Sequence, residues 1–148
     1  MIYIYKIYIM ISAETNLTEI FLNKFCNIKE KSIFMDYQIF KYFANESNYD
    51  TITIFVIDCL KSILINNTTF TIHLSLKSLT LKELDKHYNY ITKVCTIFKN
   101  EFPDKLDICF IYHAPFVFSQ IISIISVFID KKTQKKLQLV DKTTSFQI

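Results

Sequence analysis

The groups in this sequence that could carry out catalysis are cysteine thiols, histidine imidazoles and carboxylates. His113 could serve as a base for Cys109 or Cys59, or act together with Asp58. Cys109 and His113 would share one face of an expected strand, about 13 Å apart along it. A nucleophile and its base must lie within hydrogen-bond reach, so this pair fails. We therefore expect no enzyme activity, with Cys59 left as an open alternative, and we expect His113 to be a hydrogen-bonding turn residue.

The cysteines show no spacing that is typical of a metal site or a redox motif. Cys26, Cys59, Cys95 and Cys109 all lie inside apolar runs, and no two of them form a C-x-x-C pair. Isolated cysteines of this kind are usually small buried apolar residues in a reducing compartment. We expect no metal and no other cofactor, and a cytoplasmic location.

Four lysines crowd a short turn near the end of the chain. Lys131, Lys132, Lys135 and Lys136 fall within six residues. Such a cluster can attract anionic lipid head groups, because each lysine near a charged membrane contributes about 1 kcal/mol. The alternative is a basic turn that is simply solvated.

Two absent residue types exclude several classes of function. The chain contains no glycine, which excludes the glycine-rich dinucleotide fingerprint, the P-loop and the G-x-S-x-G nucleophile elbow. All 17 basic residues are lysine, and lysine lacks the planar fork with which arginine reads phosphate or guanine. The net charge is only +3. We therefore expect no nucleic-acid partner.

The lysine turn belongs to a stretch, residues 102–140, with clear boundaries between elements. Pro103 should end a preceding helix, because the residue before a proline disfavours helical angles. Residues 108–112 have the length and composition of a buried strand, which Pro115 ends. Residues 116–129 form an apolar helix about 21 Å long, too short to cross a bilayer core of about 30 Å.

This stretch resembles the CRAL-TRIO (Sec14-like) lipid-binding domain family. Residues 102–106 read FPDKL, residues 111–116 read IYHAPF and residues 130–136 read DKKTQKK. The family pattern is roughly (Y/F)-P-E-(R/K)-L, then N-A-P before a hydrophobic helix, then D-P-x-T-x-x-K before an apolar strand. This chain has Asp104 for the usual Glu, His113 for Asn and Lys131 for Pro.

The resemblance implies a set of site residues. The apolar helix would be a gate over a hydrophobic pocket whose walls include Phe116, Phe118, Ile122 and Ile125. Head-group contacts in phosphoinositide-binding members correspond here to Asp104, Thr133 and Lys136, although the shorter Asp104 reaches less far than Glu. The remaining lysines of the turn, Lys131, Lys132 and Lys135, would face an anionic membrane surface.

The rest of the chain suggests alternating strands and helices. We expect strands over residues 1–11 and 51–60, the second being a central parallel strand that Asp58 closes. We expect helices over residues 16–26, 32–44 and 80–101, with capping residues Asn16 and Thr80. Residues 70–77 alternate apolar and polar side chains, which leaves an additional edge strand open, and residues 137–140 form a last strand.

The expected architecture is therefore one α/β domain with a mostly parallel sheet, helical crossovers and an apolar gate helix. The resemblance implies a CRAL-TRIO/Sec14-like domain over residues 1–148, truncated at its C-terminus and lacking the helical extension that usually precedes the first strand. The expected function is non-catalytic binding or transfer of a lipid, either a phospholipid or a phosphoinositide, at a membrane surface. The alternative is a protein-interaction module of the same fold, for example one that binds a small GTPase.

Overall fold

The structure is a computed structural model that describes residues 1–146. Its centre is a five-stranded sheet in the order β1-β2-β3-β4-β5. The first two strands form an antiparallel hairpin, and every later neighbour is parallel. The strand bounds are Cys26–Lys29, Ser32–Asp36, Phe70–Ser75, Leu106–Tyr112 and Leu137–Leu139. The mixed α/β fold class with a mostly parallel sheet is confirmed.

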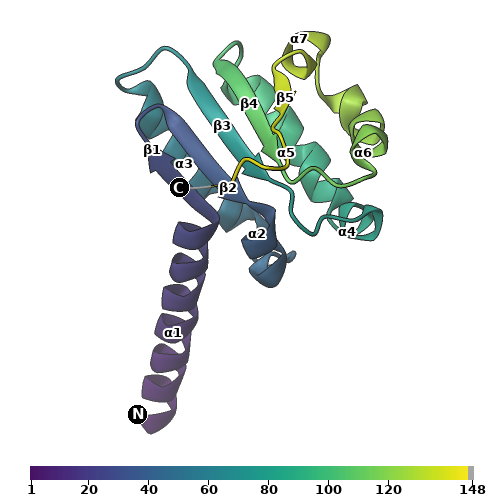
Figure 1. The fold of residues 1–148 in the computed structure, drawn as a ribbon. Helices are drawn as coiled ribbons and strands as arrows, with labels where there is room; N and C mark the ends of the chain where they lie inside the picture. The colour runs from purple at the N-terminus through teal and green to yellow at the C-terminus, as the bar shows by residue number, and fades with distance from the viewer. Residues whose placement is uncertain (147–148) are drawn as a thin grey trace.

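Helices connect the parallel strands and cover one face of the sheet (Figure 1). The helices α2 and α3 join β2 to β3, α4 and α5 join β3 to β4, and α6, a 3-10 turn η1 and α7 join β4 to β5. Their bounds are Tyr37–Phe43, Tyr49–Leu64, Leu81–Lys86, Tyr88–Glu101, Phe118–Ile125, Ser126–Phe128 and Lys131–Gln134.

A long first helix, α1, spans Ile2–Phe25 and projects from the rest of the molecule (Figure 1). Only its last turns pack against the domain, where Leu22 and Phe25 are buried. Within residues 1–146, no helix combines the length and the apolar character needed to cross a membrane.

The prediction of strands over residues 1–11 and 51–60 is wrong. Both segments are helical, in α1 and α3. Both are nearly continuous apolar runs rich in β-branched residues, and such runs do not distinguish a buried helix from a strand. The buried residues of α3 include Ile52, Val56 and Leu60, whose spacing of four defines one helical face. Asp58 is exposed on α3 and closes no strand.

Other boundaries need smaller corrections. The helix expected over residues 16–26 exists, but Asn16 lies inside α1 and caps nothing. The helix expected over residues 32–44 is shorter, because β2 takes its first five residues and Asp36 caps α2 by accepting a hydrogen bond from the Gln38 amide. Residues 70–75 are a strand, β3, but it pairs on both sides and is central.

Several predictions near the end of the chain are confirmed. Thr80 caps α4 by accepting a hydrogen bond from the Glu83 amide, and α5 ends at Glu101, before Pro103. The two predicted strands, now β4 and β5, are parallel neighbours. The apolar segment 116–129 is helical but begins at Phe118 and tightens into η1.

The two faces of the sheet bury different side chains. Registered neighbours Ile72 and Cys109 lie on the helical face, where the main core is. On the opposite face the register aligns Phe34, His73 and Phe110 in a row across three strands. Phe34 stacks on His73 with ring centroids 4.3 Å apart, and Phe146 covers this row by packing on Phe34. The end of the described chain therefore covers the face that the helices leave open.

The packing of α3 on the sheet gives a stability prediction. Leu60 is fully buried, whereas Ile54 on the outer side of α3 is 60% exposed. Leu60→Ala should lower the free energy of unfolding by about 2–5 kcal/mol, because it removes buried methyl groups and leaves a cavity. Ile54→Ala is the matched control and should change it by less than about 0.5 kcal/mol. Urea unfolding measures both; equal losses would contradict the helical packing of this segment.

Candidate functional site

An apolar cavity of about 320 Å³ lies between the helical face of the sheet and the helices above it. Strands β2, β3, β4 and β5 contribute one wall, and α2, α3, α5 and α6 contribute most of the others, with Phe25 of α1 and Leu84 of α4. Representative wall residues are Met35, Leu74, Ile111, Val56, Phe98 and Ile122. The volume is at the lower end of the roughly 300–1,000 Å³ that is usual for ligand sites.

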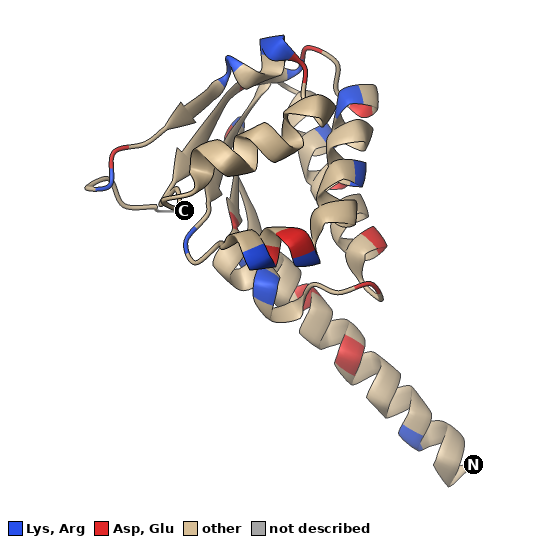
Figure 2. Cartoon of the chain, turned by 90° about the vertical axis from the view of Figure 1, so that its right-hand side faces the viewer, with Lys and Arg blue, Asp and Glu red and all other residues tan. Residues whose placement is uncertain are grey.

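The helix α6 forms one wall of this cavity through the side chains that the sequence points to. Phe118, Ile122 and Ile125 line the cavity, and so does Ile121, which the sequence reasoning missed. The polar residues Ser119 and Ser123 are exposed on the other side. No charged residue occurs in α6, which Figure 2 shows as a helix without blue or red. An amphipathic helix without charges suits a wall that shields an apolar space from water.

Phe116 lies apart from the other predicted wall residues. It precedes α6, its side chain is completely exposed, and it is not among the residues that line the cavity. The turn that leads into α6 begins at Pro115, whose carbonyl accepts a hydrogen bond from the Phe118 amide.

The hydroxyl groups in the cavity wall are engaged with the protein. The Tyr37 hydroxyl donates to the Glu83 carboxylate over 2.8 Å. The Thr53 hydroxyl donates to the Tyr49 carbonyl and lies 3.0 Å from the Tyr90 hydroxyl. Because these polar atoms already have partners, the cavity offers a ligand mainly apolar surface.

The lysine turn adjoins one end of the cavity. Ile129 and Leu137, which flank this turn in the sequence, both line the cavity. Between them Asp130 caps α7 by accepting a hydrogen bond from the Thr133 amide over 2.7 Å. This hydrogen bond holds the pKa of Asp130 below its usual value. The basic turn is therefore fixed directly beside an apolar space.

The three residues that correspond to head-group contacts lie in this corner but have other partners. Asp104 accepts a hydrogen bond from Lys132 Nζ over 2.5 Å, and this bond lowers the pKa of Asp104. Lys136 Nζ donates to the Leu106 carbonyl at the start of β4. Thr133 is partly buried, and its amide is the donor to Asp130. Their role in lipid binding stays a prediction.

Comparison with known proteins decides the family. A sequence model of the CRAL/TRIO domain matches residues 5–147, nearly the whole chain. The chain belongs to the CRAL/TRIO domain family. Domains of this family are generally lipid-binding or lipid-transfer domains rather than enzymes, in agreement with what the motifs of residues 102–140 implied.

A solved relative confirms the fold of this CRAL/TRIO domain. The crystal structure of Sfh5 superposes with a TM-score of 0.64 at 22% sequence identity. The match covers 73% of this chain but 41% of the Sfh5 chain. None of the curated protein sequences compared with this chain matches it.

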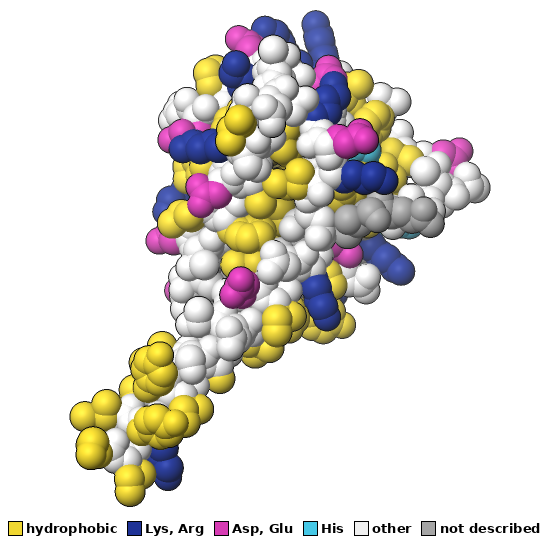
Figure 3. Space-filling view, turned by 90° about the vertical axis from the view of Figure 1, so that its left-hand side faces the viewer, with side chains coloured by type: hydrophobic (Ala, Val, Ile, Leu, Met, Phe, Trp, Pro, Cys, Tyr) yellow, Lys and Arg dark blue, Asp and Glu magenta, His cyan; other side chains and the backbone are white. Residues whose placement is uncertain are grey.

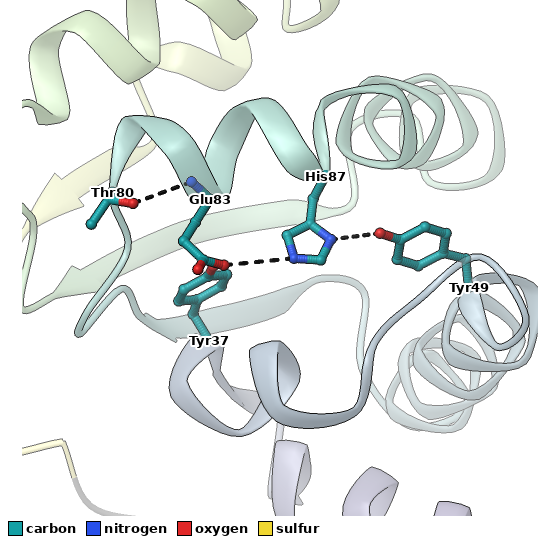
Figure 4. A network of polar contacts seen from close by, with 5 residues as sticks. All are labelled: Tyr37, Tyr49, Thr80, Glu83 and His87. Carbon is teal, nitrogen blue, oxygen red and sulfur yellow. Dashed lines mark hydrogen bonds and ion pairs between the residues drawn. The ribbon is translucent and has the colours of Figure 1, made fainter.

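The sequence reasoning missed a buried polar network beside the cavity of this CRAL/TRIO domain (Figure 4). His87, between α4 and α5, is 1% exposed and receives its closest contact from the Tyr49 hydroxyl, 2.5 Å from Nδ1. Its Nε2 lies 3.9 Å from the Glu83 carboxylate and has no hydrogen-bond partner. Burial, with a smaller contribution from Lys86, lowers the pKa of His87. The residues of this network come from α2, α3 and the segment that includes α4 and the α4–α5 junction, so no local sequence pattern could have revealed the network.

Three of the four thiols have a raised pKa, namely Cys26, Cys95 and Cys109, whereas a hydrogen bond with Cys26 lowers the pKa of Cys59. All four cysteines are free. Burial raises the pKa of Cys109 to about 12, so this residue is a thiol rather than a thiolate at neutral pH. His113 lies in the bend after β4 with φ 52°, in the left-handed region. Among residues 1–146, no group of three or more His, Cys, Asp or Glu side chains could hold a metal ion.

His87 gives a prediction for the pH dependence of stability. Its folded-state pKa is below the ordinary value of 6.5, so the unfolded chain binds this proton first on acidification. The corresponding stability is present above about pH 6.5 and is lost as the pH falls below it, at up to about 1.4 kcal/mol per pH unit for one proton. Urea unfolding between pH 7.5 and pH 5 should show this loss.

Two variants identify the residue that causes this pH dependence of stability. His87→Gln should flatten the dependence, leaving the part that the partly buried His73 contributes, since burial also lowers the pKa of His73. The exposed His113 provides the control, and His113→Gln should keep the full slope. An unchanged slope in His87→Gln would show that this residue is not the group that titrates.

Proposed function

We propose that this domain binds a lipid by enclosing an apolar chain in the cavity beneath α6. The observation that carries the proposal is the cavity itself, whose walls are apolar and whose hydroxyl groups already have partners. Each methylene group that moves from water into such a space contributes about 0.8 kcal/mol. Binding therefore requires no catalytic group, only exclusion of water from the chain.

The size of the cavity supports a ligand with one chain inside it. A methylene group is about as large as a water molecule, whose share of liquid volume is about 30 Å³. A cavity of about 320 Å³ therefore holds on the order of ten such groups without rearrangement. Two long acyl chains would require α6 to move outward.

The head group would lie outside the cavity, at the basic turn. Lys131 and Lys135 are exposed there, and Lys132 is held by Asp104. Lysine attracts an anionic phosphate as a point charge, without the fixed geometry of arginine. We propose a phospholipid or phosphoinositide taken up at the surface of an anionic membrane. The contact from Lys136 to the Leu106 carbonyl would have to open for that lysine to reach a phosphate.

The cavity weighs against the alternative of a protein-interaction module. A domain that served only to bind another protein would gain stability from a filled core, because each void costs packing contacts. Here the void adjoins both the uncharged helix and the basic turn. A lipid would account for both features, because its chain would lie beneath the uncharged helix and its head group at the basic turn.

Filling the cavity tests lipid binding. Ile122→Trp places a bulky side chain in the cavity and should lower the lipid that co-purifies, and the affinity for added lipid, by about tenfold or more. Ile124 lies on the same helix but is 42% exposed and does not line the cavity. Ile124→Trp should therefore bind lipid normally. Native mass spectrometry measures both; equal lipid content in the two variants would remove the cavity as the binding site.

Charge removal tests the basic turn. Lys131→Gln with Lys135→Gln should lower the preference for vesicles containing anionic phospholipid over neutral vesicles by roughly thirtyfold at low salt, from about 1 kcal/mol per lysine. The loss should shrink at high salt, because exposed charges are screened beyond about 10 Å at 0.1 M. Lys82→Gln with Lys86→Gln removes the same charge from α4 and is the matched control. Equal effects of the two pairs would mean that only net charge matters.

A further inference from the structure

The free part of α1 exposes more apolar surface than a helix in water should. Nine of the ten residues from 2 to 11 are Ile, Tyr or Met, and Lys6 is the one charge among them. Ile2, Tyr3 and Ile4 are each more than 70% exposed. Figure 3 shows these apolar side chains gathered at the free end of the helix. Exposed apolar clusters of this kind usually mark a contact with a partner or a membrane.

The apolar residues surround the helix instead of forming one stripe. Successive residues of a helix are rotated by about 100°, so Ile4, Ile9 and Met10 point in three different directions. Apolar residues occupy every direction around the helix axis except that of Lys6. A helix that packs on a protein is apolar on one face, whereas a helix that is apolar all round is suited to an environment that encloses it.

A second copy of the chain would cover too little of this surface. A neighbouring helix contacts a strip about 15 Å long and about 10 Å wide over these ten residues. That is well below the roughly 800 Å² that each partner of a stable interface buries. The side away from the neighbour would stay in water. Lipid covers every side at once.

The polar features of α1 also fit a lipid surface. Lys6 is basic, so its charge is complementary to anionic head groups, and its long stem can lie along apolar neighbours while the ammonium group reaches them. Tyrosines such as Tyr3, Tyr5 and Tyr8 are enriched at membrane interfaces. The hydroxyls of Ser12 and Thr15 donate to helix carbonyls and carry little cost of desolvation. Acidic and amide side chains begin only at Glu14.

We propose that residues 2–11 of α1 insert into one leaflet of a lipid bilayer and anchor the domain there. The segment is about 15 Å long, half the thickness of a bilayer core of about 30 Å. The helix then continues to Phe25, which lines the cavity, so the anchor and the cavity wall are one rigid element. In Figures 1 and 2 the free end of α1 and the helix α7 lie at opposite ends of the molecule. The anchored domain therefore leaves its basic turn free to face a second, anionic membrane, from which the proposed lipid would be taken up.

Flotation with vesicles tests the anchor in the full chain. The unaltered protein should float with phosphatidylcholine vesicles, with and without phosphatidylserine, and should keep floating at high salt. Ile4→Glu with Ile9→Glu should reduce this binding by about tenfold or more, because each buried aliphatic side chain contributes at least that factor. Both residues are exposed, so the fold should be unaffected. Ile54→Glu with Ile65→Glu alters two exposed residues of the α3 region and should float like the unaltered protein.

A fluorescence reporter tests the depth of insertion. The chain has no tryptophan, so Tyr8→Trp provides a single emission signal that should shift to the blue on addition of phosphatidylcholine vesicles. Tyr42→Trp, at a 72% exposed position in α2, should show no shift.

Each outcome separates this anchor from the alternatives. Absence of flotation in the unaltered protein, or normal flotation of the Ile4→Glu and Ile9→Glu variant, would overturn the proposal. A dimer of the unaltered protein, seen by light scattering, would also overturn the proposal if this variant abolished the dimer and the unaltered protein bound no vesicles. The anchor does not rest on lipid binding in the cavity, since Ile122→Trp should lose lipid yet still float.

Discussion

The constraint on which the rest of the structure depends is the handedness of the helical connections between its parallel strands. Strands β2 to β5 follow one another in sequence order. Connections between parallel strands of one sheet are right-handed in nearly all proteins. All the crossover helices therefore cover one face of the sheet. Helices on that face bury the core and leave the cavity, and the opposite face must be covered by something else. The row of Phe34, His73 and Phe110 with Phe146 over it is how this chain covers it.

The end of the chain could be predicted because its boundaries are encoded locally. Pro103 and Pro115 limit where a helix or strand can run, and Thr80 with Glu83 fixes a helix start. The beginning could not, because residues 1–11 and 51–60 are apolar runs with only one charged residue each, Lys6 and Asp58. In α3 the helical period is visible only from the positions of the buried residues, such as Ile52 and Leu60. Burial depends on the tertiary structure, so the sequence alone does not show this period.

The candidate site was predictable to the same extent. The family motifs pointed to α6 and to the basic turn, and these lie next to each other at the cavity. The motifs gave no information on what else closes the cavity, since Met35, Tyr90 and Phe98 come from elements far apart in sequence. The hydrogen-bond partners of the polar site residues could not be predicted from the sequence either. Asp104 and Lys136 both suggested a head-group site, but one pairs with Lys132 and the other with a main-chain carbonyl.

The ion pair of Asp104 with Lys132 affects how a basic turn could select a lipid. Burial of a chain contributes the same free energy whatever head group the chain carries, so the cavity cannot distinguish head groups. In the proposed mode of binding, discrimination would come from the turn, where a phosphate would compete with the Asp104 carboxylate for Lys132. The pair is largely exposed, with side chains 69% and 71% accessible, so its Coulomb energy is weakened by water. In the proposed mode of binding, a doubly charged phosphate would displace such a partner more readily than a neutral head group would, so the pair would favour highly charged head groups.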